Sequence, residues 1–149
     1  MTEVLIKRLS KNIELPKYET SGSSGMDLSA NIEMQIKIEP GKTSIIPTGI
    51  SVSIPKNFEI QIRSRSGLAA KSQVSVLNSP GTIDADYRGE LKVILINLSN
   101  KTFVVERGTR IAQMVLCPIV KAKFKEVDSL EDTDRGCLLY TSPSPRDPE

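Results

Sequence analysis

Residues 28–38 read LSANIEMQIKI, an alternation of apolar and polar side chains over eleven positions. Successive side chains of a β-strand point to opposite faces, so this alternation predicts a strand with one buried and one solvated face. Turn-forming residues separate several shorter stretches of the same kind. The further predicted strands are Ile50–Ile54, Phe58–Ile62, Leu91–Ile96, Phe103–Val105 and Ile111–Leu116, with Leu91–Ile96 expected to be covered on both faces. Many short strands at near-regular spacing predict an all-β jelly roll, sandwich or barrel.

Two segments depart from the strand pattern. Gly67–Ser72 is expected to form a short helical turn, with Ser66 as its N-cap. Beyond residue 126 the chain becomes acidic, and residues 141–149 hold three of its nine prolines. Proline cannot donate to a sheet ladder, so residues 127–149 are predicted to form a C-terminal arm outside a β domain of residues 1–126.

Composition excludes several classes of function. The 149 residues include 20 basic and 18 acidic side chains and no histidine, which rules out histidine triads, histidine bases and histidine zinc sites. The near-neutral balance argues against nucleic-acid binding, and the apolar runs are too short to span a membrane. Cys117 and Cys137 form no CxxC motif, which suits a reducing compartment. A cytoplasmic protein is expected, with a nuclear or organellar location left open.

Four loops are rich in polar residues and glycine. In the first, Ser23–Leu28, a single acidic residue follows a glycine and is more often a turn former than a metal ligand. In the second, Arg63–Ala69, two arginines, two hydroxyls and a glycine precede the predicted helix. Guanidinium groups beside free helix amides favour a phosphate site over a plain solvated turn.

The third and fourth loops leave two interpretations open. Asn78–Gly89 brings an amide, Asp84, Asp86 and Tyr87 into one hairpin-like loop, which is either a nucleotide pocket or a hairpin with polar decoration. If the loop is extended, its two carboxylates point the same way and only one is free for chemistry. In Arg107–Met114, Gln113 is either a satisfied core amide or an outward-facing strand residue.

The order and spacing of these loops resemble the motifs of the trimeric deoxyuridine triphosphatases (dUTPases). The resemblance extends from about residue 5 to residue 136. It is carried by Gly25–Leu28, Arg65–Ala69, Gly81–Gly89 with Asn78 ahead of it, and Arg107–Met114. It implies a jelly-roll-like β-barrel that assembles as a homotrimer with active sites between subunits. It also implies conversion of dUTP to dUMP and pyrophosphate with Mg²⁺, which limits uracil in DNA and supplies dUMP for dTMP synthesis.

The resemblance also assigns roles to individual residues. Asp84 would activate the attacking water, Asp27 would hold Mg²⁺ through water, and Tyr87 would lie under the deoxyribose. Phosphate contacts would come from Arg65, Ser66, Gly67, Gln113 and Arg135. Uracil would be received by Asn78, Gly81, Thr82, Ile83 and Asp84, with the backbone of Lys92 bordering the pocket.

The fifth family motif is altered. Arg135-Gly136 is present, but residues 137–149 replace a glycine-rich stretch with a phenylalanine and look like sequence of foreign origin. Loss of this lid predicts a large drop in turnover with dUTP binding partly kept. The alternatives are therefore a dUTP-binding but catalytically impaired homotrimer, a dCTP deaminase-like enzyme of the same fold, and a plain structural β-sandwich.

Overall fold

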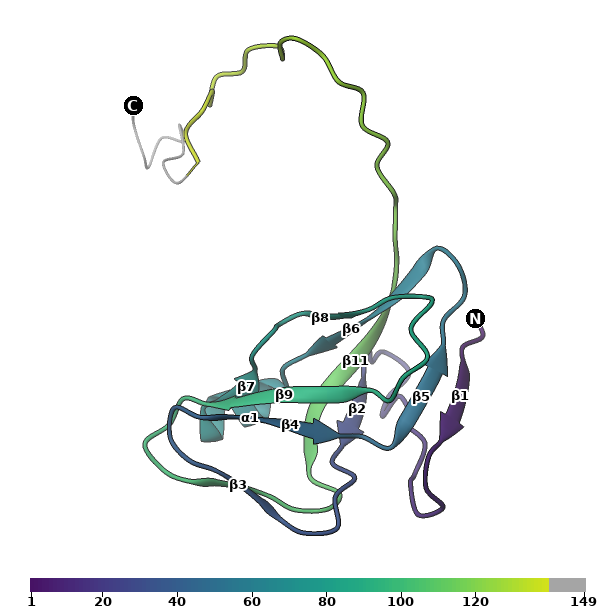
Figure 1. Cartoon of the computed structure of the whole chain (residues 1–149), viewed down its shortest axis with the longest axis vertical. Coiled ribbons are helices and arrows are strands. Elements are labelled where there is room, and N and C mark those ends of the chain that lie inside the picture. The colour runs from purple at the N-terminus through teal and green to yellow at the C-terminus, as the bar shows by residue number, and fades with distance from the viewer. Residues whose placement is uncertain (140–149) are drawn as a thin grey trace.

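In residues 1–139, which the computed structural model describes, short strands follow one another with a single helix between the sixth and seventh (Figure 1). The elements are β1 (Leu5–Arg8), β2 (Met26–Ser29), β3 (Ile36–Ile38), β4 (Thr43–Pro47), β5 (Ile50–Ser53), β6 (Phe58–Arg63), α1 (Ser66–Ser72), β7 (Val74–Val76), β8 (Gly81–Ile83), β9 (Lys92–Asn97), β10 (Phe103–Val105) and β11 (Arg110–Pro118). The all-β prediction with one short helix is confirmed.

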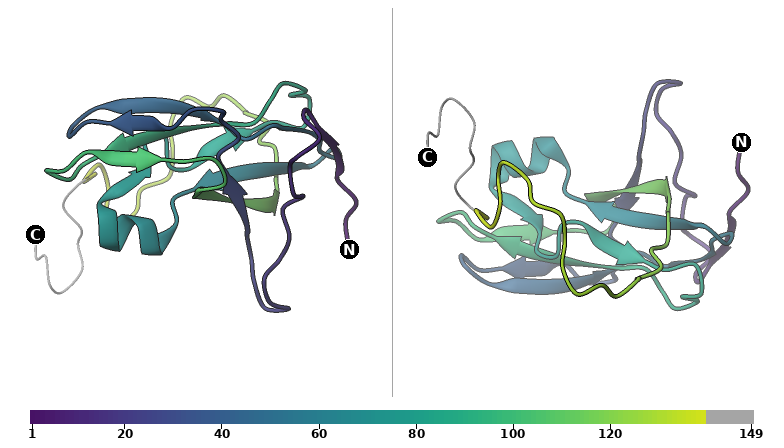
Figure 2. Two further views of the ribbon diagram at one scale, coloured as in Figure 1. Left: turned by 90° about the horizontal axis from the view of Figure 1, so that it is seen from below. Right: turned by 90° about the horizontal axis from the view of Figure 1, so that it is seen from above.

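The strands pair only in antiparallel fashion. The two larger sheets have the orders β2-β11-β6-β8 and β4-β9-β7, and the pairs β1-β5 and β10-β3 complete the arrangement. Within residues 1–139 these sheets do not join into one closed barrel. Figure 2 shows that α1 and the loop between β1 and β2 project from the same side of the stacked strands.

The core lies where the inward-facing positions of the strands meet. On β6, Ile60 and Ile62 are each 3% exposed, while their neighbours face outward. β9 buries Val93 and Leu95 but leaves Ile94 half-buried, so the expectation that this strand is covered on both faces is wrong. No second layer covers its outer face in the part of the chain that the structure describes.

The alternating stretch 28–38 does not form one strand. β2 ends at Ser29 and β3 begins at Ile36, because the backbone between them turns from one sheet to another. Ala30 exchanges its hydrogen bonds with the turn before β11, and Asn31 donates to Pro47 at 2.9 Å. Ala30 and Ile32 remain buried, so the alternation records burial correctly although ladder pairing is interrupted.

The chain leaves the body of the protein after β11. The backbone of Ile119 still donates to Asn57 at 2.9 Å, and residues 120–139 form no helix or strand and run away from the sheets (Figure 1). Val120 and Phe124 are almost fully exposed on this segment. The division at residue 126 stays a prediction, and residues 140–149 of the altered tail lie outside the described residues. No helix in residues 1–139 is long and apolar enough to cross a membrane.

Candidate active site

The loop between β6 and α1 presents backbone donors and a guanidinium. Arg65 has an extended backbone and occupies the N-cap position, so the prediction of Ser66 as N-cap is wrong by one residue. Ser66 is the first helical residue, and the first amide that finds a helical partner is that of Ala69, which donates to Arg65 at 3.0 Å. The amides of Ser66 and Gly67 are therefore left for another acceptor.

Arg65 belongs to a cluster of four charged side chains. Its Nε lies 3.2 Å from Oδ1 of Asp27, and Nη1 of Arg110 lies 3.3 Å from Oδ2 of the same carboxylate. Arg110 also approaches Glu19, with Nη2 3.8 Å from Oε1. Both oxygens of Asp27 are thus paired with guanidinium groups, and the charge of the cluster is balanced.

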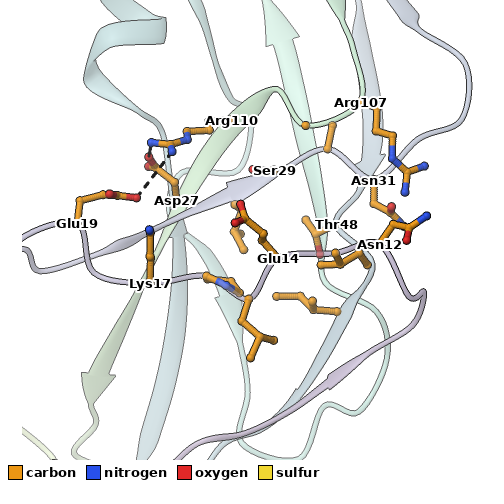
Figure 3. Close-up of a pocket in the computed structure, with 17 residues that line it drawn as sticks. Asn12, Glu14, Lys17, Glu19, Asp27, Ser29, Asn31, Thr48, Arg107 and Arg110 are labelled. Carbon is orange, nitrogen blue, oxygen red and sulfur yellow. Dashed lines mark hydrogen bonds and ion pairs between the residues drawn. The ribbon is translucent and has the colours of Figure 1, made fainter.

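Three members of this cluster, Glu19, Asp27 and Arg110, line one side of a pocket of about 300 Å³ (Figure 3). The loop before β2 and the turn before β11 form its walls, and Asp27 and Arg110 stand at its edge. Arg65, Gln113 and Asp84 do not line it. The predicted site residues therefore lie outside this pocket, apart from Asp27.

Gln113 connects the first, second and fourth motifs. It lies on β11 opposite Asp27, and its Nε2 donates to the carbonyl of Ser64 at 3.2 Å. A Cβ on Gly25 would lie 2.6 Å from Oε1 of Gln113, so a larger residue there would displace the Gln113 side chain. The Gln113 amide is half-buried beside the Arg65 loop, and its hydrogen bond to Ser64 satisfies one of its donors.

The third motif forms a tight hairpin rather than an extended segment. β8 ends at Ile83, and the amide of Tyr87 donates to the carbonyl of Asp84 at 3.1 Å. The loop is hairpin-like as predicted, and the extended arrangement in which Asp84 and Asp86 would point the same way does not apply. Asp84 and Tyr87 are exposed, and Arg88 stabilises the turn by donating to the carbonyl of Ala85 at 2.6 Å.

The residues predicted to receive uracil lie together at one end of this hairpin. Asn78 is close to Gly81, since a Cβ on that glycine would lie 3.2 Å from Nδ2 of Asn78. The amide of Leu77 donates to Ile94 at 2.8 Å, and continuing this antiparallel register brings Asn78 towards the start of β9 at Lys92. The side chains of Thr82 on β8 and Lys92 on β9 are exposed.

Within one chain, the carboxylate of Asp84 lies far along β6 from the loop that carries Arg65. Ile83 pairs with Ile60, so Asp84 lies towards the start of β6, whereas Arg65 follows the end of β6. The strand from Ile60 to Arg63 alone spans roughly 10 Å at about 3.3 Å per residue. In one chain the two residues therefore lie beyond opposite ends of this stretch, more than roughly 10 Å apart along the strand.

Arg135 is also remote from the other predicted residues. It lies on the segment that leaves the body of the protein (Figure 1), and its guanidinium bonds locally. Its Nε and Nη2 each donate at 2.6 Å, to the carbonyls of Leu138 and Leu139. Two of its guanidinium nitrogens are therefore occupied by backbone carbonyls of the tail.

Several residues of the site were not identified by sequence reasoning. Arg110 was quoted only as part of a motif, although its guanidinium pairs with Asp27. Ser64 holds the loop by accepting from the amide of Val76 at 2.9 Å. The sequence signal for both was their position: Arg110 lies three residues before Gln113, and Ser64 directly precedes Arg65.

A guanidinium with free helix amides at one strand end, and an exposed carboxylate on a hairpin, are groups that a phosphohydrolase requires. The family model described as dUTPase matches residues 11–140. The chain belongs to the dUTPase family. This family match does not favour the dCTP deaminase or the plain structural sandwich.

Named relatives cover almost the same length. The chain is 54% identical over 137 residues to the deoxyuridine 5'-triphosphate nucleotidohydrolase of Rickettsia bellii (strain OSU 85-389), covering 91% of each chain. It is 50% identical over 137 residues to the protein of the same name from Fusobacterium nucleatum subsp. nucleatum, covering 91% of this chain and 94% of that one.

Solved structures confirm the jelly-roll-like fold of this family. A variant of the Staphylococcus bacteriophage 80alpha dUTPase with dUpNHpp matches with a TM-score of 0.83 and 26% identity, over 95% of this chain and 98% of that one. A dUTPase variant from phage phi11 of S. aureus matches with a TM-score of 0.77 and 24% identity, over 87% and 99% of the two chains. The phi11 structure concerns the coordination of a structural Mg(II) ion.

Proposed function

We propose that this chain converts dUTP to dUMP and pyrophosphate in a site shared between copies of the chain. This activity would limit uracil in DNA and supply dUMP for dTMP synthesis. The observation that carries the proposal is the free carboxylate of Asp84 at the head of a hairpin that also carries Asn78 and Tyr87. The relatives named as deoxyuridine 5'-triphosphate nucleotidohydrolases support it. The reducing environment suited to free Cys117 and Cys137 supports a cytoplasmic location.

Asp84 acts as the general base. Its side chain is exposed and forms no hydrogen bond or ion pair with residues 1–139, while its carbonyl is fixed by the amide of Tyr87. An unpaired carboxylate accepts a proton from a water molecule placed against the α-phosphorus. Departure of pyrophosphate then leaves dUMP.

The phosphates are held by the loop before α1 and by Gln113. The guanidinium of Arg65, the hydroxyl of Ser66 and the amide of Gly67 supply charge-assisted and dipolar hydrogen bonds. Asp27 keeps the Arg65 guanidinium in place through the 3.2 Å ion pair. Gln113 reaches the α-phosphate region from the neighbouring strand.

The residues present fit Mg²⁺ that is carried by the triphosphate rather than held in a protein cage. Residues 1–139 contain no group of three or more acidic or thiol side chains that could hold a metal ion. Asp27 offers a single carboxylate beside two arginines, and Mg²⁺ commonly keeps its waters and binds one carboxylate plus substrate phosphates. The ion supplies neutralisation of phosphate charge, and Asp27 would contact it through water.

The hairpin that carries Asp84 selects the base and the sugar of the nucleotide. The amide of Asn78 and the backbone of Gly81, Thr82, Ile83 and Asp84 receive uracil, bordered by the backbone of Lys92. A narrow pocket of this kind excludes the 5-methyl group of thymine by shape and the 4-amino group of cytosine by donor–acceptor mismatch. Tyr87 lies where a ribose 2′-hydroxyl would collide.

A homotrimer would complete the site. In one chain, Asp84 lies near the start of β6 and Arg65 lies past its end. For both to contact one triphosphate, the hairpin of one copy must face the phosphate loop of another. Closed symmetric assembly supplies such shared sites in equivalent copies. The exposed Phe124 on the segment after β11 is consistent with a chain that packs against a neighbour.

The altered tail supports a second candidate, a dUTP-binding trimer with impaired turnover. Arg135 donates to carbonyls of the tail, so a γ-phosphate would have to displace those bonds. Without glycines after Gly136, the arm cannot lie closely along the phosphates. dUTP binding would persist through the remaining motifs.

The direct test is pyrophosphate release by the purified chain from dUTP, dTTP, dCTP and UTP with Mg²⁺. Release from dUTP alone supports the triphosphatase. Binding of dUTP without release supports the impaired trimer, and ammonia release from dCTP would contradict both.

A further inference from the structure

We propose that Glu90 is a positioning residue, which fixes the ring of Tyr87 against the body of the protein and thereby sets the discrimination between deoxyribose and ribose. The inference rests on the proposed function, because it takes Tyr87 as the residue under the sugar. No motif role was assigned to Glu90 from the sequence. The role is inferred from two hydrogen bonds of Glu90: its backbone carbonyl accepts from Tyr87, and its carboxylate accepts from Gly49.

Three contacts define where the Tyr87 ring lies. Its hydroxyl donates to the backbone carbonyl of Glu90 at 2.8 Å, and its amide donates to Asp84 at 3.1 Å. The ring lies over Gly89, where a Cβ would come within 2.7 Å of Cζ. The side chain is nevertheless 42% exposed, so few neighbours restrain it from the solvent side.

Glu90 joins this hairpin to a distant part of the chain. Its Oε2 accepts a hydrogen bond from the amide of Gly49 at 2.9 Å, between residues 41 positions apart. Gly49 has a φ of 76° and links β4 to β5, so the carboxylate is attached to a turn between two core strands. A backbone amide bonded to a carboxylate is a charge-assisted bond and stronger than a neutral one.

The next residue completes the attachment. Leu91 is fully buried, and its amide donates to Ile50 at 2.9 Å. The Glu90 side chain thus bonds the exposed hairpin to the core one residue before the chain becomes buried at Leu91. Exclusion of a 2′-hydroxyl by a ring depends on a ring that cannot move aside. Loss of the carboxylate would let the carbonyl of Glu90, and Tyr87 with it, shift away from the sugar.

The experiment measures the ratio of kcat/KM for dUTP to kcat/KM for UTP in matched variants. Glu90→Ala is expected to lower this ratio about tenfold, mainly through faster use of UTP, a change worth about 1.4 kcal/mol. Glu90→Gln is expected to stay within about twofold of the parent, because the amide oxygen still accepts from Gly49. Thr48→Val is the stability control: it removes a buried hydroxyl bonded to Leu91 without touching Tyr87, so it should lower Tm and leave the ratio unchanged.

Gly89→Ala provides a second, independent variant, since its Cβ displaces the ring while Glu90 stays intact; it should lower the ratio as Glu90→Ala does. An unchanged ratio in a folded Glu90→Ala protein, or an equal loss in Glu90→Gln, would overturn the role of Glu90. If Glu90→Ala does not fold, Gly89→Ala becomes the deciding variant. An unchanged ratio of kcat/KM for dUTP to that for UTP in this variant then overturns the proposal. A parent chain that hydrolyses dUTP and UTP equally would refute the proposed function instead.

Discussion

Arg65 and Asp27 form an ion pair with Nε 3.2 Å from Oδ1, and Arg110 takes the other oxygen of the carboxylate at 3.3 Å. Asp27 thus faces two guanidinium groups before any substrate is present. Under the proposed function, the primary effect of Asp27 is to orient Arg65 towards the phosphates, and its contact with Mg²⁺ is through water.

Asp27→Asn should lower kcat/KM for dUTP about tenfold, the change expected when one charge-assisted contact of roughly 1.5 kcal/mol is lost. The Mg²⁺ concentration that gives half-maximal rate should stay the same, because the triphosphate carries the ion. The free energy of unfolding should fall by less than about 1 kcal/mol for each partly exposed pair. Glu19→Gln, which removes only the 3.8 Å contact of Arg110, is the matched control. A steep rise in the Mg²⁺ requirement with unchanged KM would contradict this order of roles.

Asp84→Asn should abolish pyrophosphate release, with a loss of roughly 100-fold or more, because general-base catalysis contributes about that much. Affinity for dUTP should persist, since the carboxylate is not a phosphate ligand. Asp86→Asn is the control in the same turn and should retain near-parental turnover. Equal losses in the two variants would mean that the turn as a whole, and not Asp84, carries the activity.

Replacing either of two glycines near the Arg65 loop by alanine should change Tm in opposite directions. Gly25→Ala forces a Cβ to within 2.6 Å of Gln113 and should destabilise the protein by about 1–3 kcal/mol. Gly67→Ala meets nothing within 4 Å and should leave Tm unchanged or slightly higher, since alanine favours the helix. The same Gly67→Ala variant should raise KM for dUTP, because its methyl group obstructs the approaching phosphate. An unchanged KM would remove Gly67 from the site.

Replacing residues 137–149 by a glycine-rich arm with one phenylalanine should raise kcat by orders of magnitude. The new arm would allow closure over the bound nucleotide, whereas the bonds from Arg135 to residues 138 and 139 go to backbone carbonyls that the replacement keeps. Truncation after Gly136 is the control, which frees Arg135 without supplying a lid. If the replacement gives no more than the truncation, the lid account of the tail fails.

The sequence predicted the strands whose alternation coincides with ladder pairing, such as β6 with Ile60 and Ile62 inside. It failed at residues 28–38, because alternation reports burial while pairing depends on partners elsewhere in the chain. Asn31 donates to Pro47, a bond that only the assembled fold provides. Three-residue strands such as β8 carry too few positions to show a period.

For the site, local motifs predicted Arg65, Ser66 and Gln113 as phosphate contacts, which stays a prediction, while contacts between motifs stayed hidden. Gly25 lies close to the side chain of Gln113, 88 positions along the chain. The link from Glu90 to Gly49 is likewise invisible in either segment alone. The hairpin-like loop was predicted, but the bond from the amide of Tyr87 to the carbonyl of Asp84, which fixes its turn, was not.

The measurement that tests the shared site most directly is complementation between two inactive variants. Asp84→Asn and Arg65→Ala, co-expressed with different affinity tags and purified through both, should release pyrophosphate from dUTP at about a third of the parental rate, because every mixed trimer holds one intact site among its three. Each variant alone should be inactive. A mixed assembly as inactive as its parents would contradict a site built from two copies and would require Asp84 and Arg65 to meet within one chain.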